Sequence, residues 1–430
     1  MKKIIQLKLR FFAKLILKKY KPKIVGITGS VGKTSTKEAI YSVLKTRFDV
    51  RQSVKNYNNE IGLPLTIIGV DSPGKNMFGW WGVFFKAIHL LIFKDKKYPE
   101  VLVLEMGVDR PGDMSYLTKI AKVNVGVITM ISNSHLEYFN SVKDIQKEKG
   151  LLIKKIKSGG WAILNFDNDL SKELATKSKV KTLTYGFKEG ANVRAQDLSF
   201  SFSNTKDINN LQGLSFKLTY EGSIVPVILP KVIGYNSAYA ALAAAAIGVA
   251  YDMNLVEVAT ALRDFTSPPG RMNLIPGIKN TLIIDDTYNS SPQSSISALD
   301  ILSKISLPSE KRKFAILGGM LELGRETESG HREVGQAVVK AGVDKLIVVG
   351  ERARDIARGA QDTGMEREDI FEFKNADEAK VFVQNRLQAG DLALVKGSQG
   401  LRMEKIVKEV MAEPLRAKEL LVRQDESWNP

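Results

Sequence analysis

The sequence predicts an α/β protein built from two successive sheet-containing domains. Strand-like apolar runs alternate with helical stretches in two series, which is typical of mainly parallel sheets covered on both faces. A segment with two prolines and a glycine, residues 267–273, separates the two series. The length of 430 residues also favours two or three domains over one.

The first series begins after Pro22, where KIVGITGSVGKTSTKEAIYSVL predicts a short buried strand, a glycine-containing loop and a helix. Residues 182–232 lose the helical pattern and alternate as strands, which predicts a small antiparallel insert. An alanine-rich helix follows at 234–253. The other predicted strands are 101–107, 125–131 and 161–166, and the other helices are 112–121, 142–156 and 168–177.

The second series predicts an open, Rossmann-like α/β sheet. Its strands are predicted in TLIIDDTY, FAILGG, KLIVVG and LALVKGS, with helices between them. The GxGxxG fingerprint does not occur here, which argues against dinucleotide binding. The predicted organisation is a basic N-terminal helix (1–22), a central domain with a parallel sheet and an antiparallel insert (23–267), and a C-terminal Rossmann-like domain (268–430).

The composition excludes several kinds of site. The chain has no cysteine, so disulfides, cysteine-bound zinc and thiol nucleophiles are impossible. This suits a reducing cytoplasm, which is the location we expect. The chain has three histidines, and any histidine-based site must use His89, His135 or His331.

Much of the net charge of +16 lies in an N-terminal arm, because residues 1–23 carry nine Lys or Arg and no acidic residue. Nucleic acid is disfavoured as a partner, since apolar residues interleave with the basic ones and no nucleic-acid motif is visible. Frequent lysines and the lack of a small-residue cleavage site also argue against a signal peptide. The residues that predict an amphipathic helix are Ile4, Ile5, Phe11, Phe12, Leu15 and Ile16, with Lys8 and Arg10 between them.

Two interpretations of this helix remain open. It could lie on an anionic membrane surface, such as the inner membrane face, or pack on the protein's own core. A second apolar stretch, residues 77–94, is short for a bilayer span and is interrupted by Lys86 and His89. It could form an interfacial or partner-binding hairpin, with Trp80 and Trp81 suited to a membrane interface, or a buried helix.

The strongest motif is the loop between the first predicted strand and its helix. In this setting, backbone N–H groups and the helix N-terminus point at a phosphate. Lys33 can neutralise the β- and γ-phosphates, and Thr34 can bind Mg²⁺. The spacing is a shorter variant of the Walker motif, because Ile27 stands where that motif has its first glycine. The predicted nucleotide-binding residues are Thr28, Gly29, Ser30, Val31, Gly32, Lys33, Thr34 and Ser35.

The segment TGSVGKTSTKE (28–38) resembles the phosphate loop of the Mur ligase family, and further blocks resemble family motifs in the same order. The resemblance runs from about residue 23 to the LLVRQ tail. Several blocks are similar to the branch that adds D-alanyl-D-alanine. The blocks are NYNNEIG (56–62), EMGVDRPGDM (105–114), SHLEYF (134–139), QKEKG (146–150), PPGRMN (268–273), DDTYNSSPQS (285–294), LGGMLELG (317–324), HREVG (331–335) and KGSQGLRME (396–404).

The resemblance implies a P-loop ATPase domain in a ligase that joins a carboxylate to an amine through an acyl phosphate, using ATP and Mg²⁺. Such a reaction needs charge neutralisation and placement around an in-line phosphoryl transfer, but no protein nucleophile. The implied catalytic residues are Lys33, Lys149, His135 and Arg271. The resemblance implies two magnesium ions. The residues that would bind or orient them are Thr34, Glu105, His135 and Lys149, with a carbamylated Lys149 bridging to one ion. Unmodified, Lys149 would be one more surface lysine.

The resemblance also implies contacts from the later part of the chain. Arg271 would contact the γ-phosphate, and Asp286 would contact the ribose. The alternatives are that Arg271 is only a charged residue of the linker and that Asp286 is only a carboxylate at the end of a strand. The remaining implied nucleotide contacts are Tyr288 and Asn289, together with Asn236, which replaces a family histidine at an adenine-binding position. Lys396, Ser398 and His331 are candidates for binding the amine substrate or for holding loops.

The implied substrates are a UDP-sugar peptide precursor and D-alanyl-D-alanine. This branch carries an N-terminal domain for the UDP-sugar, whereas only the basic arm precedes the loop here. We therefore expect that the sugar is held differently, that another protein supplies the domain, or that the substrate is lipid-linked and meets residues 1–20 and 77–94 at the membrane. Gln399 stands where the family has an arginine, which weakens any assignment to the amine substrate's carboxylate.

Three other functions compete with this one. A folylpolyglutamate synthase shares both domains, but the EMGVDRPGD, NNEIG and DDTYN blocks favour the Mur branch. A lipid-precursor amidating subunit needs a cysteine-rich zinc ribbon, which this chain cannot build. A non-catalytic nucleotide-binding scaffold is disfavoured because Lys33, Thr34, Glu105, His135 and Lys149 are all intact.

Overall fold

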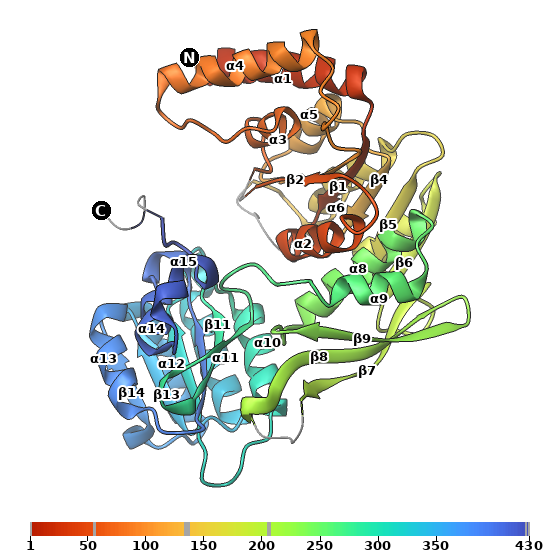
Figure 1. The fold of residues 1–430 in the computed structure, drawn as a ribbon. Helices are drawn as coiled ribbons and strands as arrows, with labels where there is room; N and C mark the ends of the chain where they lie inside the picture. Colours follow the sequence, from red (N-terminus) through yellow and green to blue (C-terminus); the bar gives the residue numbers. More distant parts are fainter. Residues whose placement is uncertain (1, 55–56, 133–137, 204–207, 426–427, 429–430) are drawn as a thin grey trace. The chain divides into compact units, whose positions relative to one another are not determined.

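The computed structural model describes residues 2–54, 57–132, 138–203, 208–425 and 428. It divides into two compact units (Figure 1). The first consists of Met1–Leu198, Ser215–Ile228 and Tyr235–Phe265, and the second of Ser199–Leu214, Leu229–Gly234 and Thr266–Pro430. Each unit contains a sheet with helices, so the predicted α/β class with two sheets is confirmed.

A nine-stranded sheet in the order β2-β3-β1-β4-β5-β6-β7-β8-β9 forms the framework of the first unit. The strands from β2 to β7 are parallel, and β3 and β4 are buried along their whole length, as expected for a sheet covered on both faces. The strands are β1 Lys23–Thr28, β2 Val50–Gln52, β3 Val101–Glu105, β4 Val125–Ile128, β5 Trp161–Asn165, β6 Lys181–Gly186, β7 Val193–Phe202, β8 Leu211–Tyr220 and β9 Ser223–Pro230.

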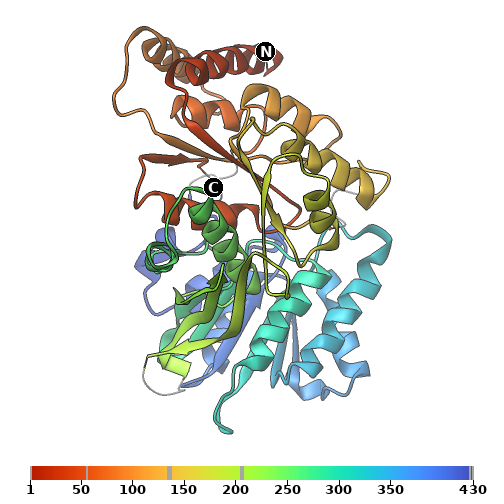
Figure 2. The same cartoon turned by 90° about the vertical axis from the view of Figure 1, so that its right-hand side faces the viewer.

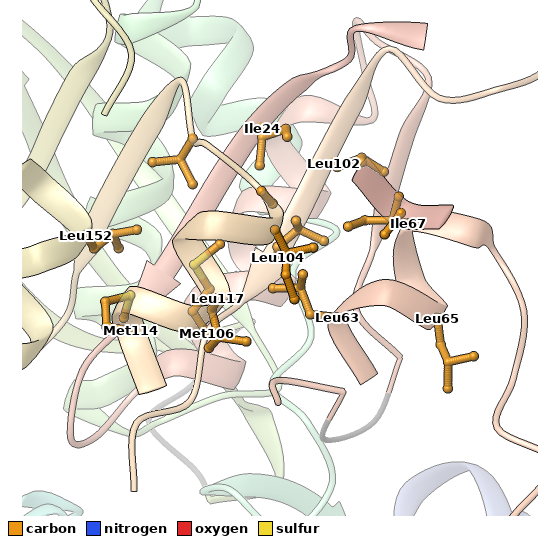
Figure 3. Packing of buried hydrophobic residues seen from close by; sticks show 14 of the residues in the cluster. Ile24, Leu63, Leu65, Ile67, Leu102, Leu104, Met106, Met114, Leu117 and Leu152 are labelled. Carbon is orange, nitrogen blue, oxygen red and sulfur yellow. The ribbon is translucent and has the colours of Figure 1, made fainter. Parts of the chain in front are cut away.

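Helices cover both faces of this sheet. On one face α2 contacts α8 and α9, and on the other α3, α5 and α6 share a core with Ile24, Leu102 and Leu104. Figure 3 shows Leu63 of α3 and Leu117 of α5 beside Leu104 of β3. The helices are α1 Lys2–Tyr20, α2 Lys33–Leu44, α3 Gly62–Ile68, α4 Met77–Ile92, α5 Asp113–Ile120, α6 Val142–Lys154, α7 Asp169–Thr176, α8 Tyr235–Ala250 and α9 Leu255–Leu262.

The basic N-terminal arm is helix α1, and it packs on the protein's own core. Leu9, Ala13 and Ile16 are fully buried against α3 and α4. Of the apolar residues that predicted the helix, Ile4, Phe11 and Leu15 remain exposed, so α1 has apolar residues on two sides. The stretch 77–94 forms α4, which is likewise buried on one side and exposed on the other.

The predicted antiparallel insert corresponds to β7, β8 and β9. A two-residue turn at Glu221 and Gly222 joins β8 to β9, and both residues have positive φ, 46° and 80°. Such turns connect antiparallel neighbours, whose twist they match. The insert was expected to begin at residue 182. The segment 181–186 instead forms β6, a strand of the parallel part of the sheet.

The second unit is built on a six-stranded sheet in the order β10-β11-β15-β12-β13-β14. Its strands are parallel except for β10, which pairs antiparallel with β11 at the edge. The strands are β10 Asn273–Pro276, β11 Leu282–Asp286, β12 Lys313–Gly318, β13 Lys345–Val349, β14 Ile370–Phe373 and β15 Leu392–Lys396. The helices are α10 Pro292–Lys304, α11 Thr327–Lys340, α12 Arg354–Asp362, α13 Ala376–Arg386, α14 Glu404–Val410 and α15 Ala417–Leu420.

Candidate active site

The phosphate-loop motif lies between β1 and α2, at the carboxyl edge of the first unit's sheet. Gly32 caps α2 with a φ of 86°, a conformation that glycine adopts without strain. A Cβ at Gly29 would lie 1.9 Å from Thr129 Oγ1, so no other residue fits there unless the loop moves. Backbone and helix terminus are therefore arranged as an anion-binding loop requires.

The end of β4 holds this loop in shape. The Ser30 N–H donates to the Met130 carbonyl at 2.6 Å, and the Ser30 hydroxyl bonds both the carbonyl (3.2 Å) and the N–H (3.1 Å) of Ser132. The Thr129 hydroxyl donates to the Val31 carbonyl at 2.6 Å. The loop conformation is thus fixed by its neighbour in the sheet, a role for Thr129 that the sequence motif did not indicate.

Two lysines converge on one carbonyl of the loop. Lys33 Nζ donates to the Gly29 carbonyl at 2.8 Å, and Lys149 Nζ donates to the same oxygen at 3.2 Å. Lys149 is 1% exposed, whereas Lys147 on the same helix is 76% exposed, so the surface-lysine interpretation of Lys149 is wrong. Burial, and then the charge of Lys33, lower the pKa of Lys149 to about 7. An anion beside these groups would relieve their repulsion.

A carboxylate lies on the other side of the loop. Glu105, at the end of β3, is buried, and its two oxygens accept hydrogen bonds from the Thr34 hydroxyl and the Asn58 amide, both at 3.1 Å. Neither donor carries a charge, so Glu105 can provide its negative charge to a cation. A hydroxyl and a carboxylate are oxygen ligands of the type that Mg²⁺ prefers, together with water and phosphate oxygens.

The donor set fits magnesium bound jointly with a nucleotide better than a metal held by protein alone. Within the described ranges, no three His, Cys, Asp or Glu side chains gather into a metal-binding group. His135, predicted to bind the metal, lies outside the described residues. Asn58 was not predicted individually, although it lies in the NYNNEIG block.

The remaining predicted nucleotide residues of the first unit have different environments. Thr28 and Ser35 are buried on either side of the loop. Val31 is partly exposed at the loop's tip. Asn236 lies exposed in the first turn of α8. The structure therefore gathers the loop, Thr34, Glu105 and Lys149 at one edge of the sheet.

In the second unit, Asp286 and Asn289 share a partner. Lys396, at the end of β15, is 3% exposed, and its ammonium bonds the Asp286 carboxylate at 2.6 Å and the Asn289 carbonyl at 2.9 Å. The pair joins the loops that follow β11 and β15, which are neighbours in the sheet. Lys396 thus pairs with the Asp286 carboxylate and fixes the loop that carries it.

Arg271 and Tyr288 also lie together. The Arg271 guanidinium stacks on the Tyr288 ring at 4.1 Å, while its buried Nε has no hydrogen-bond partner among the described residues. Gly270 ties this segment to β11, because its N–H donates to Asp285 at 3.0 Å and its carbonyl accepts from the Tyr288 N–H at 3.0 Å. Asp285 also accepts the Thr287 hydroxyl at 2.7 Å, and burial raises the pKa of its carboxyl to about 7.

The C-terminal tail braces the same loop, which the sequence did not indicate. Arg423 donates to the carbonyls of Thr287 (3.1 Å) and Tyr288 (2.5 Å). Its charge is balanced by Glu404 at 2.9 Å, a carboxylate that also bonds Arg402. The only sequence signal for this brace was the position of Arg423 in the LLVRQ block.

Ser398 and His331 hold loops of the second unit. The Ser398 hydroxyl accepts the Leu321 N–H at 2.9 Å. His331 is fully buried, and its Nε2 accepts the Met320 N–H at 2.8 Å. Its Nδ1 therefore carries the proton and donates to the Thr327 carbonyl at 2.5 Å. With both ring nitrogens occupied, His331 positions a loop.

We expect His331 to make the protein less stable in mild acid. Burial lowers the pKa of His331, so the folded protein favours the neutral ring that accepts the Met320 N–H. Above a pH of about 6.5, the pKa of histidine in the unfolded chain, His331 contributes its full stabilisation. This stabilisation is lost as the pH falls through the lower pKa that His331 has in the folded protein. The free energy of unfolding, measured with urea at about pH 8 and about pH 5, should differ less between the two pH values in the His331→Gln variant than in wild type. An unchanged difference would contradict the assignment.

We expect Lys396→Met to lower the free energy of unfolding by about 3 kcal/mol, because the Asp286 carboxylate would lose its buried ion-pair partner. Replacing both residues, as Lys396→Met with Asp286→Asn, should restore most of the loss. Lys304→Met is the matched control, since Lys304 and Asp300 form an exposed pair, for which we expect less than about 1 kcal/mol. Equal losses in both single variants, measured by urea unfolding, would rule out the buried ion pair.

Comparisons with known families agree with this arrangement. The model of the Mur ligase middle domain matches residues 27–77 and 87–248, which include the phosphate loop, Glu105 and Lys149. The model described as "Mur ligase, glutamate ligase domain" matches residues 270–399, which include Arg271, Asp286 and Lys396. Together the two models cover most of both units.

Individual relatives are similar over nearly the whole chain. The UDP-N-acetylmuramoyl-tripeptide–D-alanyl-D-alanine ligase of Bacillus subtilis is 29% identical over 407 residues, which are 95% of this chain and 80% of the relative. The Escherichia coli enzyme of the same name is 27% identical, over 90% of this chain and 76% of its own. The crystal structure of MurF ligase from Thermotoga maritima in complex with ADP has a TM-score of 0.75 and 27% identity, covering 96% of this chain and 84% of that one. From its loop to its C-terminal sheet, this chain belongs to the Mur ligase family.

Proposed function

We propose that this chain is an ATP-dependent, ADP-forming ligase that joins D-alanyl-D-alanine to a UDP-N-acetylmuramoyl-tripeptide during peptidoglycan synthesis. The observation that carries the proposal is the joint placement of Lys33, Thr34 and Glu105 around a preformed phosphate loop. The relatives from Bacillus subtilis and Escherichia coli bear the name of this reaction.

The reaction would proceed in two steps. A carboxylate oxygen of the tripeptide attacks the γ-phosphorus of ATP, and ADP leaves. The amine of D-alanyl-D-alanine then attacks the carbonyl carbon of the acyl phosphate, and inorganic phosphate leaves as the amide bond forms and the amine loses a proton. The loop N–H groups and Lys33 stabilise the charge that develops on the transferred phosphoryl group.

We assign magnesium to Thr34 and Glu105, with His135 and Lys149 as further residues of a two-ion site. When bound, magnesium would neutralise phosphate charge during the transfer. Lys149 would serve as a carbamate, formed when its neutral amine attacks CO₂ and releases a proton. Its burial and low pKa favour the neutral, nucleophilic amine that this modification requires.

We assign the second half of the chain to completing the site. In this proposal residues 23–267 bind ATP and residues 268–430 form the domain that brings Arg271 to the γ-phosphate and Asp286 to the ribose. Tyr288 and Asn289 would lie near the nucleotide, and Asn236 would take the adenine-side position. The stacking of Arg271 on Tyr288, and the hold of Lys396 on Asp286, keep these groups in place.

We further propose that the enzyme works in the cytoplasm and contacts the inner membrane face through residues 1–20 and 77–94. Among the described helices, none combines the length and apolar character needed to cross a bilayer. We propose that this contact is peripheral.

A substrate panel tests the proposal. Purified protein with ATP and Mg²⁺ should release phosphate only when UDP-N-acetylmuramoyl-tripeptide and D-alanyl-D-alanine are both present. Mass spectrometry should find the joined product. Phosphate release with folate and glutamate instead would favour the folylpolyglutamate synthase alternative. ATP binding without turnover on any pair would indicate a non-catalytic scaffold.

A further inference from the structure

We propose that α1 and α4 together form a surface that docks on anionic lipid bilayers. This platform consists of the exposed apolar residues Ile4, Leu7, Phe11 and Leu15 of α1 and Phe78, Trp81, Phe85, Ile88 and Ile92 of α4, with the lysines around them. This docking rests on the proposed membrane contact but not on the ligase reaction, because neither helix contributes a residue to the phosphate loop.

The two helices are joined by contacts along their length. They lie side by side in both views (Figures 1 and 2), and contacts join their middles and their C-terminal ends, so the two helices run in the same direction. The rings of Phe12 and Phe84 meet at 5.9 Å near the middle. At the end of α1, the Lys19 ammonium donates to the carbonyls at the end of α4, those of Leu90, Leu91 and Phe93, each at 2.9 Å. Tyr20 adds bonds to two of these carbonyls.

Each helix has a buried side and an exposed apolar side. α1 is anchored by Leu9, Ala13 and Ile16, and α4 by Trp80, Val83, Ala87 and Leu90, all in the same hydrophobic core. The exposed apolar residues recur at helical spacing of three or four on both helices, so they form two stripes. Side chains as large as Phe78 (85% exposed), Trp81 (67%) and Phe85 (70%) would not normally remain in water together.

The charge around these stripes identifies the partner. α1 contains no acidic residue, and its exposed lysines include Lys3, Lys8, Lys14 and Lys18. Exposed lysines also flank α4 at Lys75, Lys94, Lys96 and Lys97. An apolar stripe with aromatic residues and a basic rim matches an anionic lipid surface, where rings enter the interface and lysines meet headgroups. A second copy of the chain would instead bring two basic rims together.

The apolar part is tested with vesicles and the full-length protein. Wild type should co-sediment with vesicles of phosphatidylcholine and phosphatidylglycerol, and much less with phosphatidylcholine alone. Trp81→Ser with Phe85→Ser should weaken binding roughly tenfold or more, because two exposed aromatic rings that would enter the lipid interface are lost. Leu415→Ser is the matched control, since Leu415 is 98% exposed on the second unit. Its binding should equal that of wild type.

The contribution of the lysines to lipid binding is tested by reversing their charge. Lys14→Glu with Lys18→Glu should weaken binding to the anionic vesicles roughly tenfold or more, and added salt should weaken wild type in the same way. Lys188→Glu with Lys418→Glu reverses two exposed lysines outside the platform and should have little effect. Retained ATP binding in every variant shows that the fold is intact.

Position-specific quenching shows which face touches lipid. Brominated lipids should quench the tryptophan fluorescence of wild type, and Trp81→Phe should bind vesicles normally but lose most of the quenching. Absence of binding to anionic vesicles would overturn the proposal, as would equal binding by the platform and control variants. Self-association that the same platform variants abolish, without vesicle binding, would assign the surface to a second copy and also overturn it.

Discussion

Replacing Lys33 with alanine should reduce ligase turnover by about a thousandfold or more, because the loop would lose the cation that stabilises the transferred phosphoryl group. In the structure the Lys33 ammonium lies over the loop, at 2.8 Å from the Gly29 carbonyl. The side chain is only half-buried, so its removal should leave the fold intact. Phosphate release with both peptide substrates is the measurement.

The matched control is Lys45→Ala, which removes an exposed lysine just after the same helix. Its turnover should stay close to that of wild type. A thermal unfolding curve of the Lys33→Ala protein that matches wild type separates chemistry from folding. Turnover reduced less than about tenfold would mean that Lys33 does not contact the transferred phosphoryl group, and the placement of ATP would then be wrong.

The elements that the sequence predicted best are those with a local cause. The loop from Gly29 to Lys33 follows from a buried strand, two glycines and a helix, all contiguous in the chain. Glu105 could be expected at the sheet edge because it ends an apolar strand. The strands of the second unit were recognisable as short apolar runs, except β10 and β14, which have only four residues each.

The remaining features depend on contacts between segments far apart in the chain. Lys149 and Lys147 stand two residues apart in the same polar segment, and it is the packing of α6 that buries Lys149. Helix α1 has apolar residues on two sides, so periodicity alone could not divide Leu9 and Ile16, which are buried, from Leu7 and Phe11, which are exposed. The brace of Arg423 on Tyr288 joins residues separated by 135 positions.

The same dependence on packing makes Lys149 a sensitive test of the site. We expect Lys149→Ala to lose at least about a hundredfold in turnover, because the position next to the loop would carry neither an amine nor a carbamate. Lys147→Ala, two residues earlier on the solvent-exposed side of the same helix, should have little effect. Equal activity of both variants would show that Lys149 only fills space.

Carbamylation itself can be separated from a structural role of Lys149. Native mass spectrometry in bicarbonate should find a mass increase equal to one CO₂ in wild type but not in Lys149→Ala. After CO₂ is removed, added bicarbonate should restore activity faster above about pH 7 than below it, since burial lowers the pKa of Lys149 to about 7 and only the neutral amine reacts. Lys149→Arg keeps a buried cation but cannot form this carbamate, so it should remain inactive whether or not bicarbonate is present. Full activity of Lys149→Arg would show that the positive charge suffices and that no carbamate is needed.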